Sequence, residues 1–219
     1  MLRGILLGGL CLLSMSAWAQ SLESSSEIKN GGLTIQLLNP QTEQPFPFYQ
    51  YRGGSMFAGP SHEPYLIQVT NNQALRIELL VGVENKDPRT GEAARLGQAG
   101  YIINPGQTLR LKHGRQKQSF VFPETNANYD HLTKAPALQL IIYQEVPNYP
   151  YVLPWAKPIA FTSIDVSTNK KDWSPYIPPL FRRNTARYPD VLLIKIGSTE
   201  YLQQTGILPS NNTTAVGTQ

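Results

Sequence analysis

Alternation of apolar and polar side chains is the feature that most constrains this chain. It runs through several short segments after residue 30, such as residues 33–37 and 75–83. A period of two residues places the apolar side chains on one face of a β-strand, whereas a helix needs a period near 3.6. No segment keeps a helical period, and the best helical fragment, residues 90–98, spans one or two turns at most. Further strand candidates are residues 67–69, 109–111, 120–122, 138–143 and 191–196.

Turn-forming residues separate these segments. We interpret Asn71-Asn72-Gln73 as a hairpin turn that joins two strands. Asn104-Pro105-Gly106 places proline and glycine at adjacent central turn positions. Short strands with frequent turns predict an all-β fold, an antiparallel β-sandwich of the immunoglobulin-like or jelly-roll-like kind.

The domain organisation follows from the same pattern. We expect the sandwich domain at residues 28–166 and an extension at residues 167–203. The extension contains one further strand and packs on the sandwich or on a partner. Residues 204–219 are rich in Thr, Asn, Gly and Gln, a composition that predicts a disordered tail. With 41% hydrophobic residues, the chain has enough apolar surface for a real core.

The first 19 residues are typical of a cleaved signal peptide. Arg3 provides the positive start, residues 5–13 the apolar run, and Ala17-Trp18-Ala19 the small-x-small cleavage site. Cys11 is the only cysteine of the chain, so the mature protein would contain none. We therefore expect a bacterial periplasmic or secreted protein without disulfides or a transmembrane segment. Removing Arg3 lowers the net charge from +4 to +3, and no dense Lys/Arg stripe favours nucleic acid.

Several motifs lie between residues 45 and 145. They are an aromatic segment before Gly53-Gly54, the run Tyr65 to Asn71, the run Gly100 to Gly106, and Phe120-Val121-Phe122. Together they resemble the pattern of a family of exported bacterial proteins of unknown function. The chain departs from the family pattern at residues 83–85 and 112–115. The resemblance implies a β-sandwich and export, and it supplies no activity.

Proline, aromatic and cationic residues concentrate after residue 145. Prolines favour extended backbone there. We interpret the region as a contact surface for another envelope protein or an anionic envelope polymer. The alternative is that its aromatic side chains pack on the sandwich while its charges are solvated. The candidate partner-binding residues are Trp155, Trp173, Tyr176, Phe181, Arg182, Arg183 and Arg187.

Catalytic and metal-binding motifs are not evident. His62, His113 and His131 form no close pair, and the crowded polar residues at 84–92 lack the order of a calcium loop. We expect no cofactor and no metal. The sequence thus favours a non-catalytic envelope protein with a binding or structural role. Two alternatives stay open: a small exported hydrolase or carbohydrate-binding module, and a periplasmic chaperone-like protein, since residues 177–182 resemble a run of pilus chaperones.

Overall fold

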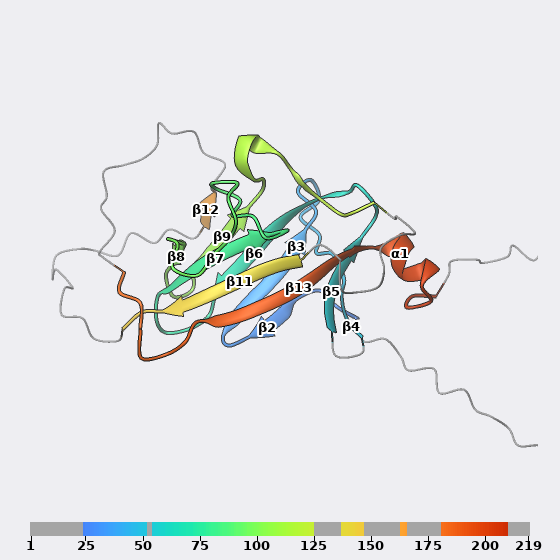
Figure 1. The fold of residues 1–219 in the computed structure, drawn as a ribbon. Coiled ribbons are helices and arrows are strands. Elements are labelled where there is room, and N and C mark those ends of the chain that lie inside the picture. Colours follow the sequence, from blue (N-terminus) through green and yellow to red (C-terminus); the bar gives the residue numbers. More distant parts are fainter. Residues whose placement is uncertain (1–23, 52–53, 125–136, 147–162, 166–180, 210–219) are drawn as a thin grey trace, which may run out of the picture.

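The structure is a computed structural model of the full chain and describes residues 24–51, 54–124, 137–146, 163–165 and 181–209. Strands account for most of the regular structure in these residues (Figure 1). The strands are β1 (Ser24–Ser25), β2 (Ile28–Asn30), β3 (Leu33–Leu38), β4 (Phe48–Tyr51), β5 (Gly54–Gly59), β6 (Pro64–Asn71), β7 (Ile77–Val83), β8 (Tyr101–Ile103), β9 (Thr108–Leu111), β10 (Phe120–Val121), β11 (Ala137–Gln144), β12 (Ser163–Asp165) and β13 (Asp190–Ser198). A 3-10 turn, η1 (Arg115–Lys117), and one helix, α1 (Thr199–Gln204), complete the list.

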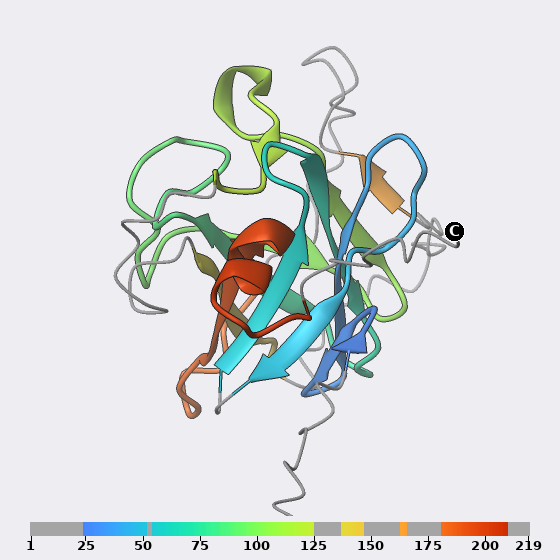
Figure 2. The ribbon, with the colours of Figure 1, turned by 90° about the vertical axis from the view of Figure 1, so that its right-hand side faces the viewer.

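Two sheets face each other across one core (Figures 1 and 2). The larger sheet has seven strands in the order β1-β4-β5-β13-β11-β7-β8. The smaller sheet has the order β12-β9-β6-β3-β2, with β10 also paired to β6. Most pairs are antiparallel, and the parallel pairs are β13 with β5 and β12 with β9. The predicted all-β sandwich is confirmed.

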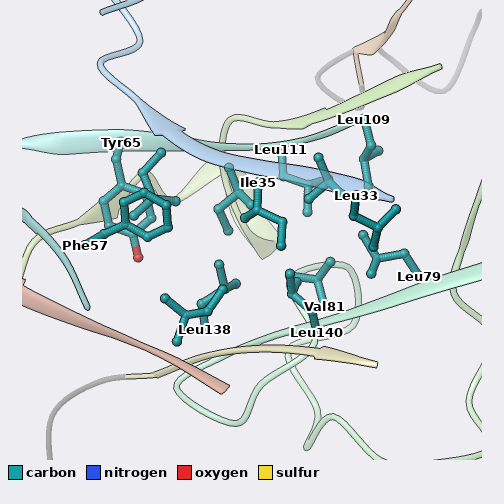
Figure 3. Packing of buried hydrophobic residues seen from close by; sticks show 14 of the residues in the cluster. Leu33, Ile35, Phe57, Tyr65, Leu79, Val81, Leu109, Leu111, Leu138 and Leu140 are labelled. Atoms are coloured by element: carbon teal, nitrogen blue, oxygen red, sulfur yellow. The ribbon is translucent and has the colours of Figure 1, made fainter. Parts of the chain in front are cut away.

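The core forms where the alternating apolar residues of the two sheets meet (Figure 3). Leu33, Ile35 and Leu109 reach inward from the smaller sheet, opposite Leu79 and Leu140 of the larger one. These side chains are fully buried or nearly so. Their burial follows from the pleat of each strand, which sends every second residue to the same face. The period-two segments of the sequence therefore supply the facing layers of the sandwich.

The segment at Asn71 does not form the hairpin that the sequence suggested. β6 belongs to the smaller sheet and β7 to the larger one, so the chain crosses between sheets there. Asn71 is fully buried, and its side-chain amide donates to the carbonyls of Leu75 (2.9 Å) and Ile103 (3.0 Å). Its Oδ1 accepts the Gln73 backbone N–H at 3.0 Å. The asparagine thus directs the chain across the core rather than back along its own strand.

The second turn has the geometry that its sequence predicts. Gln107 N–H donates to the Asn104 carbonyl at 3.0 Å, and Gly106 has a φ of +72°. Pro105 precedes this glycine, as in a type II turn. Gly106 N–H and Gln107 O also bond the backbone of Asn71, which ties this turn to the crossing between the sheets.

Two segments differ in secondary structure from the sequence interpretation. Residues 90–98 form turns and bends and no helix. Helix α1 forms instead at Thr199, after Ser198, whose hydroxyl accepts the Tyr201 backbone N–H and caps the helix. Leu202 of α1 is buried on Met56 and Ala58 at the outer face of β5. A helix this short forms because that contact holds it.

The last strand is an internal strand of the larger sheet. The sequence placed it in an extension, and the structure places β13 between β5 and β11. Asp190 to Lys195 pair with β11, and Lys195 to Ser198 pair with β5. Beyond the helix, Ile207 and Leu208 pack on the Leu202 cluster, and their N–H groups donate to the Leu202 carbonyl. Up to residue 209 the expected disordered tail is therefore ordered, and residues 210–219 lie outside the described residues.

Candidate functional site: the outer face of strand β13

Exposed apolar side chains gather at the start of β13. Val191 is 55% exposed and Leu193 is 60% exposed, and Tyr188 just before the strand is 97% exposed. Leu192 and Ile194, which alternate with Val191 and Leu193 along the strand, point to the core. The strand thus keeps one buried face and leaves an apolar face in solvent. Contiguous exposed apolar surface of this kind often marks an interaction site.

A bulged loop presents Tyr188. β11 pairs with β13 up to Ile142 and Asp190. Beyond that point Gln144 O accepts the Asn184 N–H, and Glu145 pairs with Arg183, so residues 185–189 loop out between the two paired stretches. Asn184 stabilises the loop, because its Oδ1 accepts the Ala186 N–H at 3.1 Å and its carbonyl accepts the Arg187 N–H at 3.3 Å. This local geometry accounts for the exposure of Tyr188.

A buried ion pair anchors the segment that leads into this loop. Arg183 donates to both carboxylate oxygens of Glu78, at 2.8 and 3.0 Å, and its guanidinium lies 4.0 Å from the centre of the Tyr143 ring. The Gly100 N–H adds a third donor to Glu78 at 2.6 Å. Burial alone raises the pKa of Glu78, but the Arg183 and Gly100 hydrogen bonds outweigh it, so the pKa of Glu78 is lowered.

A second ion pair lies beside the first. Arg89 donates to both oxygens of the buried Asp87 carboxylate, at 2.8 and 3.2 Å, and its guanidinium stands 4.8 Å from the centre of the Tyr101 ring. Hydrogen bonding to Asp87 raises the pKa of Arg89. Burial raises the pKa of the Tyr101 hydroxyl. Arg89 therefore stays cationic at neutral pH, and its contacts with the Gly100 carbonyl and the Tyr101 ring join the start of the 84–100 loop to its end at β8.

The structure assigns different surroundings to the predicted partner-binding residues. Trp155, Trp173 and Tyr176 lie outside the described residues. Phe181 is half-buried, and the Arg76 guanidinium lies 6.0 Å from its ring centre. Arg183 is bound to Glu78 as described above.

Two further members of that set are exposed. Arg182 is exposed, and its carbonyl accepts the Val146 N–H at 3.0 Å. Arg187 is exposed, with one guanidinium nitrogen 3.4 Å from Gln144 Oε1. Arg187 and Tyr188 are therefore the neighbours that extend the exposed face of β13 into the loop.

Val191 and Leu193 are the residues of this face that sequence reasoning missed. Residues 191–196 read as a nearly continuous apolar run, a pattern typical of a strand covered on both faces. Only Lys195 interrupts it, and one charge does not reveal that the neighbouring outward positions are uncovered. Exposure here depends on what packs over the sheet, and that information comes from distant segments.

Among the residues that the structure describes, no group of three or more His, Cys, Asp or Glu side chains is arranged to hold a metal ion. None of the helices there is long and apolar enough to cross a membrane. Every buried side-chain nitrogen and oxygen within these ranges has a hydrogen-bond partner.

Comparison of the chain with protein-family models, with curated proteins and with solved structures finds no match.

Proposed function

We propose that this protein is an exported, non-catalytic component of a bacterial cell envelope that binds a partner protein through the exposed face of β13 and its preceding loop. The observation that carries the proposal is the concentration of Tyr188, Val191 and Leu193 within six residues of chain. Exposing such side chains costs free energy in water, and a partner that covers them recovers it.

The kind of partner follows from the chemistry of the face. Three apolar side chains stand beside the cationic Arg187, and aromatic and arginine residues are enriched at protein interfaces. This mixture fits another envelope protein better than an anionic polymer, which would need charge more than apolar contact. The signal-like residues 1–19 and the resemblance over residues 45–145 support export.

Affinity capture with matched point variants tests this function. The mature protein is immobilised and incubated with envelope extract, together with Tyr188→Ser and Leu96→Ser. Leu96 is 65% exposed in the 84–100 loop, so its variant removes comparable apolar surface elsewhere. We expect one stoichiometric partner that Tyr188→Ser loses and Leu96→Ser retains. Equal capture by all three proteins, or capture of nothing, would contradict the proposal.

A further inference from the structure

Within the part of the chain that the structure describes, the first half of β13 has a partner strand on one side only. β11 pairs with Asp190 to Lys195, whereas β5 pairs with Lys195 to Ser198. On the β5 side, no strand among the described residues pairs with residues 190–194. In Figure 1 β5 diverges from β13 toward β4 along this side of the strand. The sheet is thus continuous around the second half of β13 and interrupted beside the first half.

Hydrogen bonds at the two ends of the β7–β11 ladder show which backbone groups of β13 point away from β11. Glu84 N–H donates to Ala137 O, and Glu145 N–H donates to Arg76 O. The odd-numbered residues of β11 therefore bond β7, and by alternation its even-numbered residues bond β13. The register pairs Leu138, Leu140 and Ile142 with Ile194, Leu192 and Asp190.

The backbone groups of Val191 and Leu193 consequently point away from β11. Both residues also carry the exposed apolar side chains of this strand. Their N–H and C=O groups face the open edge while their side chains cover the outer face beside it. An added strand can bond the edge and place apolar side chains next to Val191 and Leu193 at the same time.

We propose that the Asp190–Ile194 edge of β13 is a strand-addition site, which captures an extended segment of the partner protein with aliphatic residues at alternate positions. This inference rests on the proposed function and names its mode of binding. Main-chain hydrogen bonds to Val191 and Leu193 provide the register, and apolar contacts on the outer face provide selectivity.

Charge along the edge favours a partner segment over a second copy. Arg187 lies before the edge and Lys195 at its end, and Asp190 at its start carries the one negative charge of residues 187–195. This stretch is therefore net cationic, and a net acidic partner segment would complement it. Pairing of two copies would instead oppose two net cationic stretches, and opposed like charges destabilise a strand pair.

A defined probe peptide tests the site. The probe is the capped peptide Glu-Val-Thr-Val-Thr-Val-Glu, and its control is methylated on the backbone nitrogens of its three central residues, which removes the donors for either strand direction. With the mature protein, we expect the probe to bind and to shift the backbone amide NMR signals of Val191 and Leu193. The N-methylated control should bind at least about tenfold more weakly, the effect of losing one or two hydrogen bonds.

Adjacent variants separate the edge from the fold. Val191→Pro removes an N–H that faces the opening, whereas Leu192→Pro removes one that bonds β11. We expect Val191→Pro to fold but not to bind the probe, and Leu192→Pro to be less stable than the unmodified protein. Leu193→Lys keeps the backbone intact and should lower the affinity for the probe about tenfold. Leu96→Lys should bind the probe as the unmodified protein does.

Several outcomes would overturn the inference. These are no probe binding by the unmodified protein, unchanged binding in Leu193→Lys, or self-association that Leu193→Lys abolishes, which would make a second copy the occupant. If the captured envelope partner needs Tyr188 but tolerates Val191→Pro and Leu193→Lys, strand addition fails while the proposed function stands.

Discussion

At the scale of single residues, buried polar side chains decide which segments of the chain meet. Asn71 and Glu78 are buried, and each is hydrogen-bonded by groups from other segments. A buried polar group costs free energy unless it is paired, so each of these side chains specifies the position of its partners.

Replacing Asn71 should therefore destabilise the protein. Asn71→Ala leaves the carbonyls of Leu75 and Ile103 without their donor, and we expect a loss of about 2 to 3 kcal/mol in the free energy of unfolding. Asn72→Ala is the matched control, because Asn72 is exposed and its side-chain amide donates to the Thr34 hydroxyl at the surface. Its cost should stay below about 1 kcal/mol in urea denaturation. Equal losses would contradict a special role for Asn71.

The ion pair of Glu78 predicts a dependence of stability on pH. The folded-state pKa of Glu78 lies below its ordinary value of 4.5, so the unfolded chain holds the proton more tightly. The stabilisation is complete above that ordinary value and is lost as the pH falls through the lower, folded-state pKa.

Glu78→Gln should remove this dependence. It keeps the shape of the side chain but leaves Arg183 without its countercharge, so we expect a loss of about 2 kcal/mol at pH 7. The loss should shrink as the pH is lowered below 4.5, because protonation weakens the pair in the unmodified protein too. Urea denaturation over that pH range measures both curves, and parallel curves would exclude Glu78 as a source of acid sensitivity.

At the scale of elements, β13 and α1 depend on contacts with segments far away in the chain. α1 has six residues, too few to be stable alone in water. Its Leu202 side chain packs on Met56 and Ala58 of β5. The following residues 207–208 pack on the same cluster, so the helix and the chain after it are stabilised together.

Truncating Leu202 should destabilise α1 and the residues 207–208 that follow it. Leu202→Ala removes a side chain that is 1% exposed, and we expect a loss of about 2 to 4 kcal/mol. Gln203→Ala, one position along the same helix, should change stability by less than about 0.5 kcal/mol. Hydrogen exchange of the residue 201–208 amides should rise in the first variant and not in the second. No difference between the variants would mean that the helix is held by other contacts.

At the scale of the whole molecule, the end of the chain completes the larger sheet. β13 covers the core with Ile194 and Ile196, both 1% exposed, and it joins β5 to β11. Without β13 the sheet would split into two parts that share no ladder. The sandwich therefore needs residues far beyond the point where the sequence pattern suggested that the domain ends.

Two truncations test this dependence. A chain of residues 20–145 should fail to unfold cooperatively in thermal denaturation and should expose apolar surface to a dye, because its core lacks a central strand. A chain ending at Pro209 keeps β13, α1 and Leu208, and should retain the full melting transition. A cooperative transition in the shorter chain would show that β13 is dispensable for the fold.

The sequence by itself determined the strand class, the sandwich and the facing core layers, because alternation is a local property that every strand carries in its own residues. The glycine-proline turn at 104–106 was equally local. Only the tertiary structure decided the crossing at Asn71, the parallel insertion of β13 and the exposure of Val191 and Leu193. Those features depend on which distant segments meet, and no pattern within one strand encodes its neighbours.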